Sequence, residues 1–482
     1  MTSSRRDRWP AGLGTCPLAV ALATADWIVF RPGILSSDSI DQYSQALHGR
    51  FNNWHPPLMG LVLAGFLRLG LGLGWLVWMQ AFALIGGVLT LSRRVLDVRR
   101  SGQPRRGDGR IAALAGLAVL SPLLSPSLFY AVTFWKDVWT AIAMLWLAAL
   151  FLQCVRRRRD HGTSRPSTFV AFAFVVVVTP CVRHNAAVLL VPLAPMLWWS
   201  APWWGRGAGR SWRGLVAASV VGLAGLAPAA VERAAGATEG DPAAQVLALD
   251  LVGLWHAYPQ YRAQLTHTSA HVHPDLVDTR YEWGSVGPLL FTQPTIIERG
   301  LLERDPLRRE WWRAWRCFPW AMAVVKWRTF WPQLGFTARR TYYWFEPGLW
   351  SEELGLRPEG WLAARKMLVD FGEYLVAHKK TTRWLGRVHG VWVLIALGLW
   401  VAARCRRRRA TWRGLGAVAA LAVAYHAGFL LATTMPDYRF MYPATLLVQT
   451  VVVAMGAAAL VRSGPVVPRG EGSEAGAPAA SA

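Results

Sequence analysis

Charged residues are scarce in this chain of 482 residues, and acidic residues are the scarcer kind. Only 17% of the residues are charged and 53% are hydrophobic, with 28 Asp and Glu against 52 Lys and Arg. A soluble chain of this length needs more polar surface, so the composition excludes a soluble multidomain protein and indicates the lipid bilayer as solvent. The net charge of +24 does not indicate nucleic acid, because the arginines stand in short clusters between apolar runs, as in cytoplasmic loops of membrane proteins.

Cysteine and lysine are also rare. No pair of cysteines has a CxxC or other metal-binding spacing, so we expect neither a disulfide nor a cysteine-ligated metal. Lys136 is the only lysine in the first 300 positions, which makes it conspicuous. The five cysteines are Cys16, Cys154, Cys181, Cys317 and Cys405.

Long apolar runs are abundant. A bilayer core requires about 20 apolar residues per helix, and ten runs approach that length. The arginine clusters between them all fall on one side when ten spans are counted and both termini are cytoplasmic. The predicted spans lie near 12–30, 74–92, 111–130, 136–154, 167–183, 186–202, 214–232, 386–403, 412–433 and 440–461.

The predicted fold is therefore an all-α integral membrane protein with about ten transmembrane helices, interfacial helices and one large extracytoplasmic loop. Residues 1–232 form an N-terminal transmembrane module that includes the first outer loop, and residues 386–463 form the C-terminal transmembrane helices. Residues 233–385 form the large loop, whose second half is rich in Trp and is expected to rest in the headgroup layer. Residues 464–482 read as a disordered tail.

Two shorter segments need separate interpretations. The arginines before the first apolar run resemble a signal peptide, but the run resumes after Asp26, which favours an uncleaved first helix. The apolar stretch Pro56–Gly70 is too short to span, and counting it as a crossing would place an arginine cluster outside. We expect it to lie in the outer interface.

Five polar clusters interrupt apolar sequence, and the predicted topology places all of them on the outer side. Ionisable groups at membrane depth are costly and usually face a cavity or a partner. Charges at the end of a span are often only boundary markers, but such markers should decorate both faces equally. The clusters are Asp38–Gln42 with Trp54–Pro57, Trp135–Asp137, Arg183–Asn185, the large loop, and Asp437–Arg439 with Tyr442 and Pro443.

These clusters contain the residue types of a transfer site. Carboxylates such as Asp38 and Asp137 can act as a general base or orienting group, and cations such as Lys136, Arg183 and Arg439 can hold a phosphate. The histidines near His267, with His271, His273 and Asp275, lack the spacing of one helix or turn, so a solvated loop is favoured over a metal site. A divalent ion bound through the oxygens of Asp38 or Asp41 stays open.

The clusters resemble the polyprenyl-phosphate-sugar-dependent glycosyltransferases of the GT-C fold, which include the protein O-mannosyltransferase and aminoarabinose transferase families. The resemblance rests on an outer-loop acid pair, Asp38 and Asp41, followed by His55-Pro56-Pro57-Leu58 and a short apolar helix. Three later segments look like marks of a bacterial branch of this superfamily. These are Trp135-Lys136-Asp137-Val138, Arg183-His184-Asn185 and Asp437-Tyr438-Arg439-Phe440-Met441-Tyr442-Pro443.

The resemblance implies a lipid-linked sugar donor that enters the helix bundle from the side. It implies that an outer-loop acid is the base toward an acceptor hydroxyl, with Asp38 first, and Asp41 and Asp137 after it. Basic residues would hold the lipid phosphate. Many members have adjacent Asp-Glu where these acids are three apart, so Asp38 and Asp41 both stay candidates. The substrate-binding candidates are His55, Lys136, Arg183, Asn185, Asp437 and Arg439.

The prediction is thus a glycosyltransferase in a bacterial plasma membrane that moves a sugar from a polyprenyl-phosphate donor to an acceptor on the extracytoplasmic side. Its partners would be the lipid-linked donor and membrane lipids, with no nucleic acid and no certain cofactor. A transporter or flippase for a lipid-linked substrate is the alternative. The absence of an internal repeat from the sequence and the one-sided distribution of its polar residues argue against this alternative. A non-catalytic relative that binds lipid or protein is the third interpretation.

Overall fold

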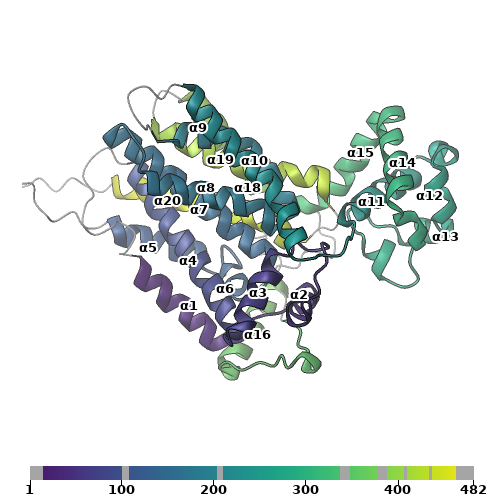
Figure 1. The fold of residues 1–482 in the computed structure, drawn as a ribbon, viewed down its shortest axis with the longest axis horizontal. Helices are drawn as coiled ribbons and strands as arrows, with labels where there is room; N and C mark the ends of the chain where they lie inside the picture. The colour runs from purple at the N-terminus through teal and green to yellow at the C-terminus, as the bar shows by residue number, and fades with distance from the viewer. Residues whose placement is uncertain are drawn as a thin grey trace, which may run out of the picture.

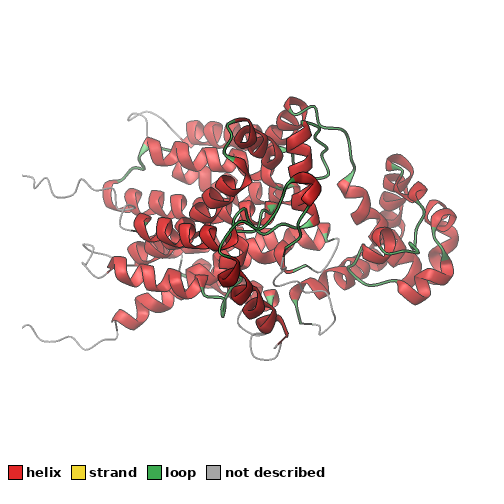
Figure 2. Ribbon diagram, turned by 90° about the horizontal axis from the view of Figure 1, so that it is seen from below, coloured by secondary structure: helices red, strands yellow, loops and turns green. Residues whose placement is uncertain are grey.

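A computed structural model describes residues 15–99, 108–202, 210–336, 348–377, 388–406, 410–433 and 437–462. Within these ranges the regular elements are helices, and the extended pairing is limited to isolated bridges. Figure 2 shows this all-helical architecture from below. The predicted all-α class is confirmed for the described residues, and the predicted tail at 464–482 lies outside them.

A bundle of long apolar helices forms the larger part of the molecule (Figure 1). Within the described residues, five helices are long and apolar enough to cross a membrane. They are α4 (Gly72–Arg99), α7 (Lys136–His161), α10 (Arg210–Ala234), α19 (Ala410–Ala432) and α20 (Tyr438–Arg462).

Shorter helices occupy the other predicted spans. α1 (Cys16–Phe30), α8 (Pro166–Val182) and α18 (His389–Cys405) are apolar helices of 15, 17 and 17 residues. The 3-10 helix η2 (His184–Leu189) leads directly into α9 (Leu190–Ser200). The span predicted at 111–130 is not one continuous helix. α5 (Asp108–Leu120) ends before Pro122 and Pro126, and a short α6 (Ser127–Ala131) follows. Proline lacks the amide hydrogen that an α-helix interior needs.

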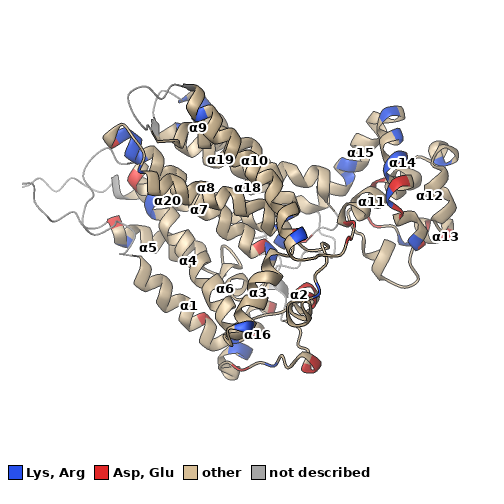
Figure 3. Ribbon diagram, viewed as in Figure 1, with Lys and Arg blue, Asp and Glu red and all other residues tan. Residues whose placement is uncertain are grey.

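The bundle interior is apolar, and α7 and α20 lie near its centre. α7 buries residues on all sides, including Val138, Leu145 and Leu152, and contacts α4, α8, α19 and α20. A helix that is hydrophobic all round is expected at the centre of a membrane bundle. Figure 3 shows that Lys, Arg, Asp and Glu concentrate at the ends of the bundle and on the neighbouring lobe.

The large loop folds into a helical lobe with a core of its own (Figure 1). Val252, Leu289 and Val325 are among the fully buried residues of this core. The lobe contains α11 (Pro242–Ala257), η3 (Pro259–Gln264), α12 (Thr266–His271), α13 (Pro274–Arg280), the π-helix η4 (Gly287–Phe291), η5 (Arg299–Leu302), α14 (Arg304–Cys317) and α15 (Pro319–Phe330).

Some tryptophans of the lobe pack on its core and others are exposed, whereas the sequence predicted that the whole Trp-rich segment rests in the headgroup layer. Trp311 and Trp315 pack against the lobe core, and the Trp311 indole donates to the buried Asp250 carboxylate (2.8 Å). Trp312, Trp320 and Trp327 stay exposed at 59, 79 and 49%. The headgroup-layer expectation is therefore wrong for Trp311 and Trp315, and it stays a prediction for the exposed tryptophans.

Short helices surround the bundle end that faces the lobe. α2 (Ser37–His48) follows α1, and α3 (Leu58–Arg68) occupies the apolar stretch predicted at Pro56–Gly70. After the lobe come η6 (Trp331–Leu334), η7 (Glu352–Leu354) and α16 (Leu362–Ala377), and α16 contacts α1.

Candidate functional site

Asp38 stands in the first turn of α2, and the start of that helix is fixed by a capping box. The Ser36 hydroxyl accepts from the Ser39 amide (3.3 Å), and the Ser39 hydroxyl accepts from the Ser36 amide (3.2 Å). Such reciprocal caps satisfy two backbone donors that a helix start otherwise leaves open. The orientation of Asp38 is thereby set by local sequence.

The same serines attach α2 to the segment before α7. The Ser39 hydroxyl donates to the Phe134 carbonyl (2.7 Å), and the Trp135 indole donates to the Ser36 hydroxyl (2.7 Å). A parallel bridge between Ile34 and Thr133 continues this contact. Lys136 follows at once as the first residue of α7, so the loops that carry Asp38 and Lys136 are held side by side.

His55 lies between these two charged residues and is buried. The Lys136 ammonium donates to His55 Nδ1 (2.6 Å), and His55 Nε2 lies 3.9 Å from Asp38 Oδ1. Burial, with the charge of Lys136 added to it, lowers the pKa of His55 to about 3. The imidazole is therefore neutral near neutral pH and accepts the Lys136 hydrogen bond through Nδ1.

Arg439 joins the site from the first turn of α20. Its guanidinium contacts Asp38 Oδ2 through Nη1 (3.1 Å) and Asp437 Oδ2 through Nε (2.6 Å). Asp437 also accepts from the Arg439 amide (3.0 Å), and its own carbonyl accepts from Gln333 (2.6 Å). Asp437 therefore fixes the orientation of the Arg439 guanidinium, and Asp437 itself does not line the cavity.

Arg183 enters from the end of α8 and is buried beside Asp137 of α7, with which it forms an ion pair. Its guanidinium also lies 4.7 Å from the centre of the Phe440 ring, a cation–π distance. Asp137 is only 1% exposed and does not line the cavity. Its position is that of a partner for Arg183.

These side chains surround one cavity of about 200 Å³ where the bundle meets the lobe. The bundle contributes the charged wall, and α11 and η4 contribute Gln245 and Phe291 opposite to it. Gln245 is buried, and its amide nitrogen has no hydrogen-bond partner in the described part of the chain. Asp38, His55, Lys136, Arg183, Asn185 and Arg439 of the predicted set line the cavity.

Asp41 is the predicted candidate that the structure separates from the others. It is exposed on α2, accepts a hydrogen bond from Gln45 one turn later (2.6 Å) and is absent from the cavity wall. Of the two acids that the sequence left as candidates, Asp38 lines the cavity and Asp41 does not.

The positive charges around Asp38 favour its ionised form. Burial by itself would raise the pKa of its carboxyl, but the positive charges of Arg439 and Lys136 outweigh burial and lower the pKa. Among the described residues, no carboxylate lies within salt-bridge distance of Lys136. The cavity thus presents a carboxylate that can accept a proton and an ammonium that can bind an anion.

The donor set does not fit a divalent cation. Asp38 is surrounded by Arg439, Lys136 and Arg183, whose charges would repel a metal ion, and Asp41 points elsewhere. In the described ranges, no group of three or more His, Cys, Asp or Glu side chains has a metal-binding arrangement.

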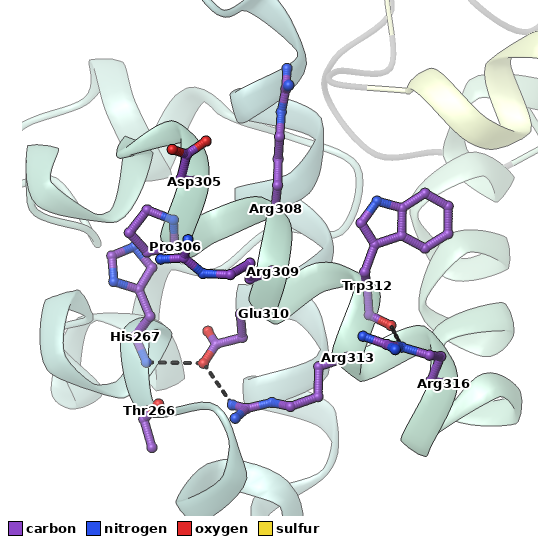
Figure 4. A pocket seen from close by; sticks show the side chains of 10 residues that line it. All are labelled: Thr266, His267, Asp305, Pro306, Arg308, Arg309, Glu310, Trp312, Arg313 and Arg316. Atoms are coloured by element: carbon purple, nitrogen blue, oxygen red, sulfur yellow. Dashed lines mark hydrogen bonds and ion pairs between the residues drawn. The ribbon is translucent and has the colours of Figure 1, made fainter.

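A second and larger cavity of about 850 Å³ lies on the lobe, away from this site (Figure 4). Its wall carries four arginines of α14, including Arg308 and Arg313, together with His267 and Glu310. Glu310 is buried and accepts from the backbone amides of His267 (2.9 Å) and Thr268 (2.8 Å), which caps the start of α12. Arg308 pairs with Asp241 (3.1 Å), so this arginine has a structural role.

The sequence did not identify the lobe side of the 200 Å³ cavity. Gln245, Val246, Val286 and Phe291 lie within the large loop, which was one of the polar clusters, but nothing in the sequence singled out these residues. Gln333, which holds the Asp437 backbone, was also missed. His184 was noted within its cluster, and the structure shows that it reaches the Asn53 carbonyl (3.2 Å).

Comparisons with known proteins add no relative to this picture. No protein-family model matches the chain, and neither the curated proteins nor the solved structures contain a match.

Proposed function

We propose that the protein is a membrane glycosyltransferase of the GT-C type, which moves a sugar from a polyprenyl-phosphate donor to an acceptor hydroxyl outside the cytoplasm. The observation that carries the proposal is the convergence of Asp38 with Lys136, Arg183 and Arg439 in one cavity at the end of an apolar bundle. These residues come from four separate places in the chain, and the proposed reaction needs both their acid and their cations.

In the proposed reaction, the Asp38 carboxylate accepts the proton of the acceptor hydroxyl as the acceptor oxygen bonds to the anomeric carbon of the sugar. The bond between that carbon and the phosphate oxygen breaks, and its electron pair leaves with the lipid phosphate. Lys136, Arg183 and Arg439 bind the negative charge that develops on this phosphate. His55 holds the Lys136 ammonium in place.

The topology belongs to the same proposal. We infer ten membrane crossings: the five long helices, the shorter apolar helices α1, α8 and α18, and two interrupted segments, α5 with α6 and η2 with α9. The arginine-rich end of α7, which includes Arg156 and Arg159, then faces the cytoplasm, and the lobe and cavity face outward. The short apolar α3 beside the site lies in the outer interface, where a lipid donor would approach.

The direct test is mass spectrometry of cell-envelope glycans from cells with and without the protein. Loss of one sugar modification, restored by the wild-type gene and not by Asp38→Asn, supports the proposal. Purified Asp38→Asn protein should still bind the lipid donor, because the cations remain. If Asp38→Asn restores the modification fully, or if the lipid-linked donor accumulates on the inner leaflet without the protein, the transferase assignment fails and transport takes its place.

A further inference from the structure

A recess at the opposite end of the bundle has a composition suited to a lipid. It has a volume of about 500 Å³ and lies between α7, α9, α18 and α19. Trp198 and Trp199 come from the last turn of α9, Arg404 from the end of α18 and Arg413 from the start of α19. The cavity that Asp38 lines uses the other ends of α7 and α19. The 15 residues of α7 from Lys136 to Phe151, at 1.5 Å per residue, separate the two by roughly 22 Å.

The recess is mostly apolar, and both large and small side chains line it. Phe151, Trp199 and Trp400 supply broad ring surfaces. Ala417 and Ala420 of α19 supply small side chains that leave the space between the helices unfilled. Such a hollow at membrane depth matches a hydrocarbon chain in shape and polarity.

The mouth of the recess is positively charged. Arg404 and Arg413 are exposed there, and Arg158 of α7 lies over the Trp199 ring (4.7 Å) and donates to the Trp199 carbonyl. The sequence contains no Asp or Glu between Glu373 and Asp437, so neither α18 nor α19 carries a carboxylate that neutralises these arginines. In the described residues no ion pair engages Arg404 or Arg413, whereas Arg156 nearby pairs with Asp97 (2.5 Å).

We propose that this recess binds an anionic diacyl phospholipid, with an acyl chain against the tryptophans and α19, and the phosphate between Arg404 and Arg413. A zwitterionic phospholipid would place its own cation beside the arginines, so it should bind more weakly. A free phosphate would not use the apolar walls. The proposal does not depend on the transferase activity, because a different set of residues at the other end of the bundle carries it.

The test is native mass spectrometry of the full chain in detergent, with phosphatidylglycerol and phosphatidylcholine of equal chain length as probes. Phosphatidylglycerol should remain bound at collision energies that remove phosphatidylcholine. The double variant Arg404→Gln with Arg413→Gln should weaken phosphatidylglycerol binding by roughly tenfold or more, since each basic residue near anionic lipid contributes measurably.

A matched control removes two exposed arginines from the same end of the bundle but outside the recess, Arg165→Gln with Arg406→Gln. It should bind as the wild type does. Ala420→Trp should block binding with all arginines present, because the indole fills the recess, and its thermal unfolding reports whether it folds. Equal binding of both lipids, an equal loss in the control variant, or displacement of the lipid by inorganic phosphate would each overturn the proposal.

Discussion

At the scale of single residues, the distinction between Asp38 and Asp41 shows how neighbours assign roles to similar side chains. Side chains three positions apart on a helix lie on overlapping faces, so the spacing of Asp38 and Asp41 alone does not distinguish their roles. Gln45, one turn after Asp41, binds that carboxylate at the surface (2.6 Å). Asp38 instead meets Arg439 (3.1 Å), which belongs to the last helix of the bundle.

This difference predicts unequal effects of two isosteric substitutions. Asp38→Asn removes the proposed proton acceptor and should lower the rate of sugar transfer by about 10² to 10⁴-fold, the usual contribution of a general base. Asp41→Asn should retain transfer close to the wild-type rate, because Asp41 is outside the cavity. The measurement is sugar transfer from a purified lipid-linked donor. Equal losses in the two variants would contradict the assignment of Asp38.

The charges around Asp38 also predict a pH dependence. Since they hold the carboxyl pKa below its ordinary value of about 3.9, transfer in the wild type should lose its base only below that pH. Arg439→Gln removes the nearest of these charges, so the acid side of the rate profile should move to higher pH. Arg31→Gln, which removes an arginine paired with Glu359 (3.0 Å) instead, is the matched control and should leave the profile unchanged.

The free energy of unfolding should also depend on pH, because the pKa values of Asp38 and His55 are lower in the fold than in the unfolded chain. The pKa of Asp38 is lower in the fold than in the unfolded chain, so its contribution is present above about pH 4 and is lost as the pH falls through the folded value. The pKa of His55 is also lowered, to about 3, so the unfolded chain binds the proton more readily. The neutral His55 therefore favours the fold fully above about pH 6.5 and progressively less below it.

At the scale of elements, α15 of the lobe packs against α19 of the bundle, and one buried lysine bonds to both parts. The Lys326 ammonium contacts the buried Asp250 carboxylate of α11 (2.7 Å) and donates to the Leu431 carbonyl in the last turn of α19 (2.7 Å). Carbonyls at a helix end have no partner within their own helix, and a lysine is well suited to bind one. Burial raises the pKa of Asp250 even though Lys326 opposes this, so the pair depends on both partners.

Breaking this contact should separate a stability effect from a site effect. Lys326→Met leaves the Asp250 carboxyl buried without its cation, which should reduce the free energy of unfolding by about 3 to 5 kcal/mol. The double variant Asp250→Leu with Lys326→Met should recover part of that loss, because no charge is left buried. Chemical or thermal unfolding in detergent measures both. A double variant that is less stable than Lys326→Met would show that the charged pair itself stabilises the fold.

At the scale of the whole molecule, two native cysteines stand at opposite ends of the inferred topology. Cys317 is exposed at the end of α14 in the lobe, and Cys405 is exposed at the end of α18 near the arginine-rich recess. Cys154 and Cys181 are buried in the bundle. The chain therefore carries a natural pair of probes for its orientation.

An impermeant thiol reagent added to intact spheroplasts should label Cys317 and leave Cys405 unlabelled until the membrane is opened. Cys317→Ser should abolish the labelling of intact spheroplasts, and Cys405→Ser should remove the Cys405 peptide from those labelled after lysis. The count is made by mass spectrometry of the labelled peptides. Labelling of Cys405 before lysis, with Cys317 protected, would reverse the inferred orientation.

The sequence by itself determined the membrane character, the helical class and most helix positions, because apolar run length is a local property that the bilayer reads directly. It also predicted which clusters carry acids and cations. It failed locally at 111–130, where Pro122 and Pro126 interrupt a run that hydrophobicity alone joins. It also assigned Trp311 to the headgroup layer, although that indole belongs to the lobe core.

Only the tertiary structure decided which clusters share a cavity. The distance from Asp38 to Arg439 depends on how α2 and α20 pack, and 401 positions separate them in the chain. The lobe side of the cavity, with Gln245 and Phe291, has no polar pattern that sequence could single out. Spacing along a chain reports which side chains share one helix face, whereas a site built from several helices depends on packing between them.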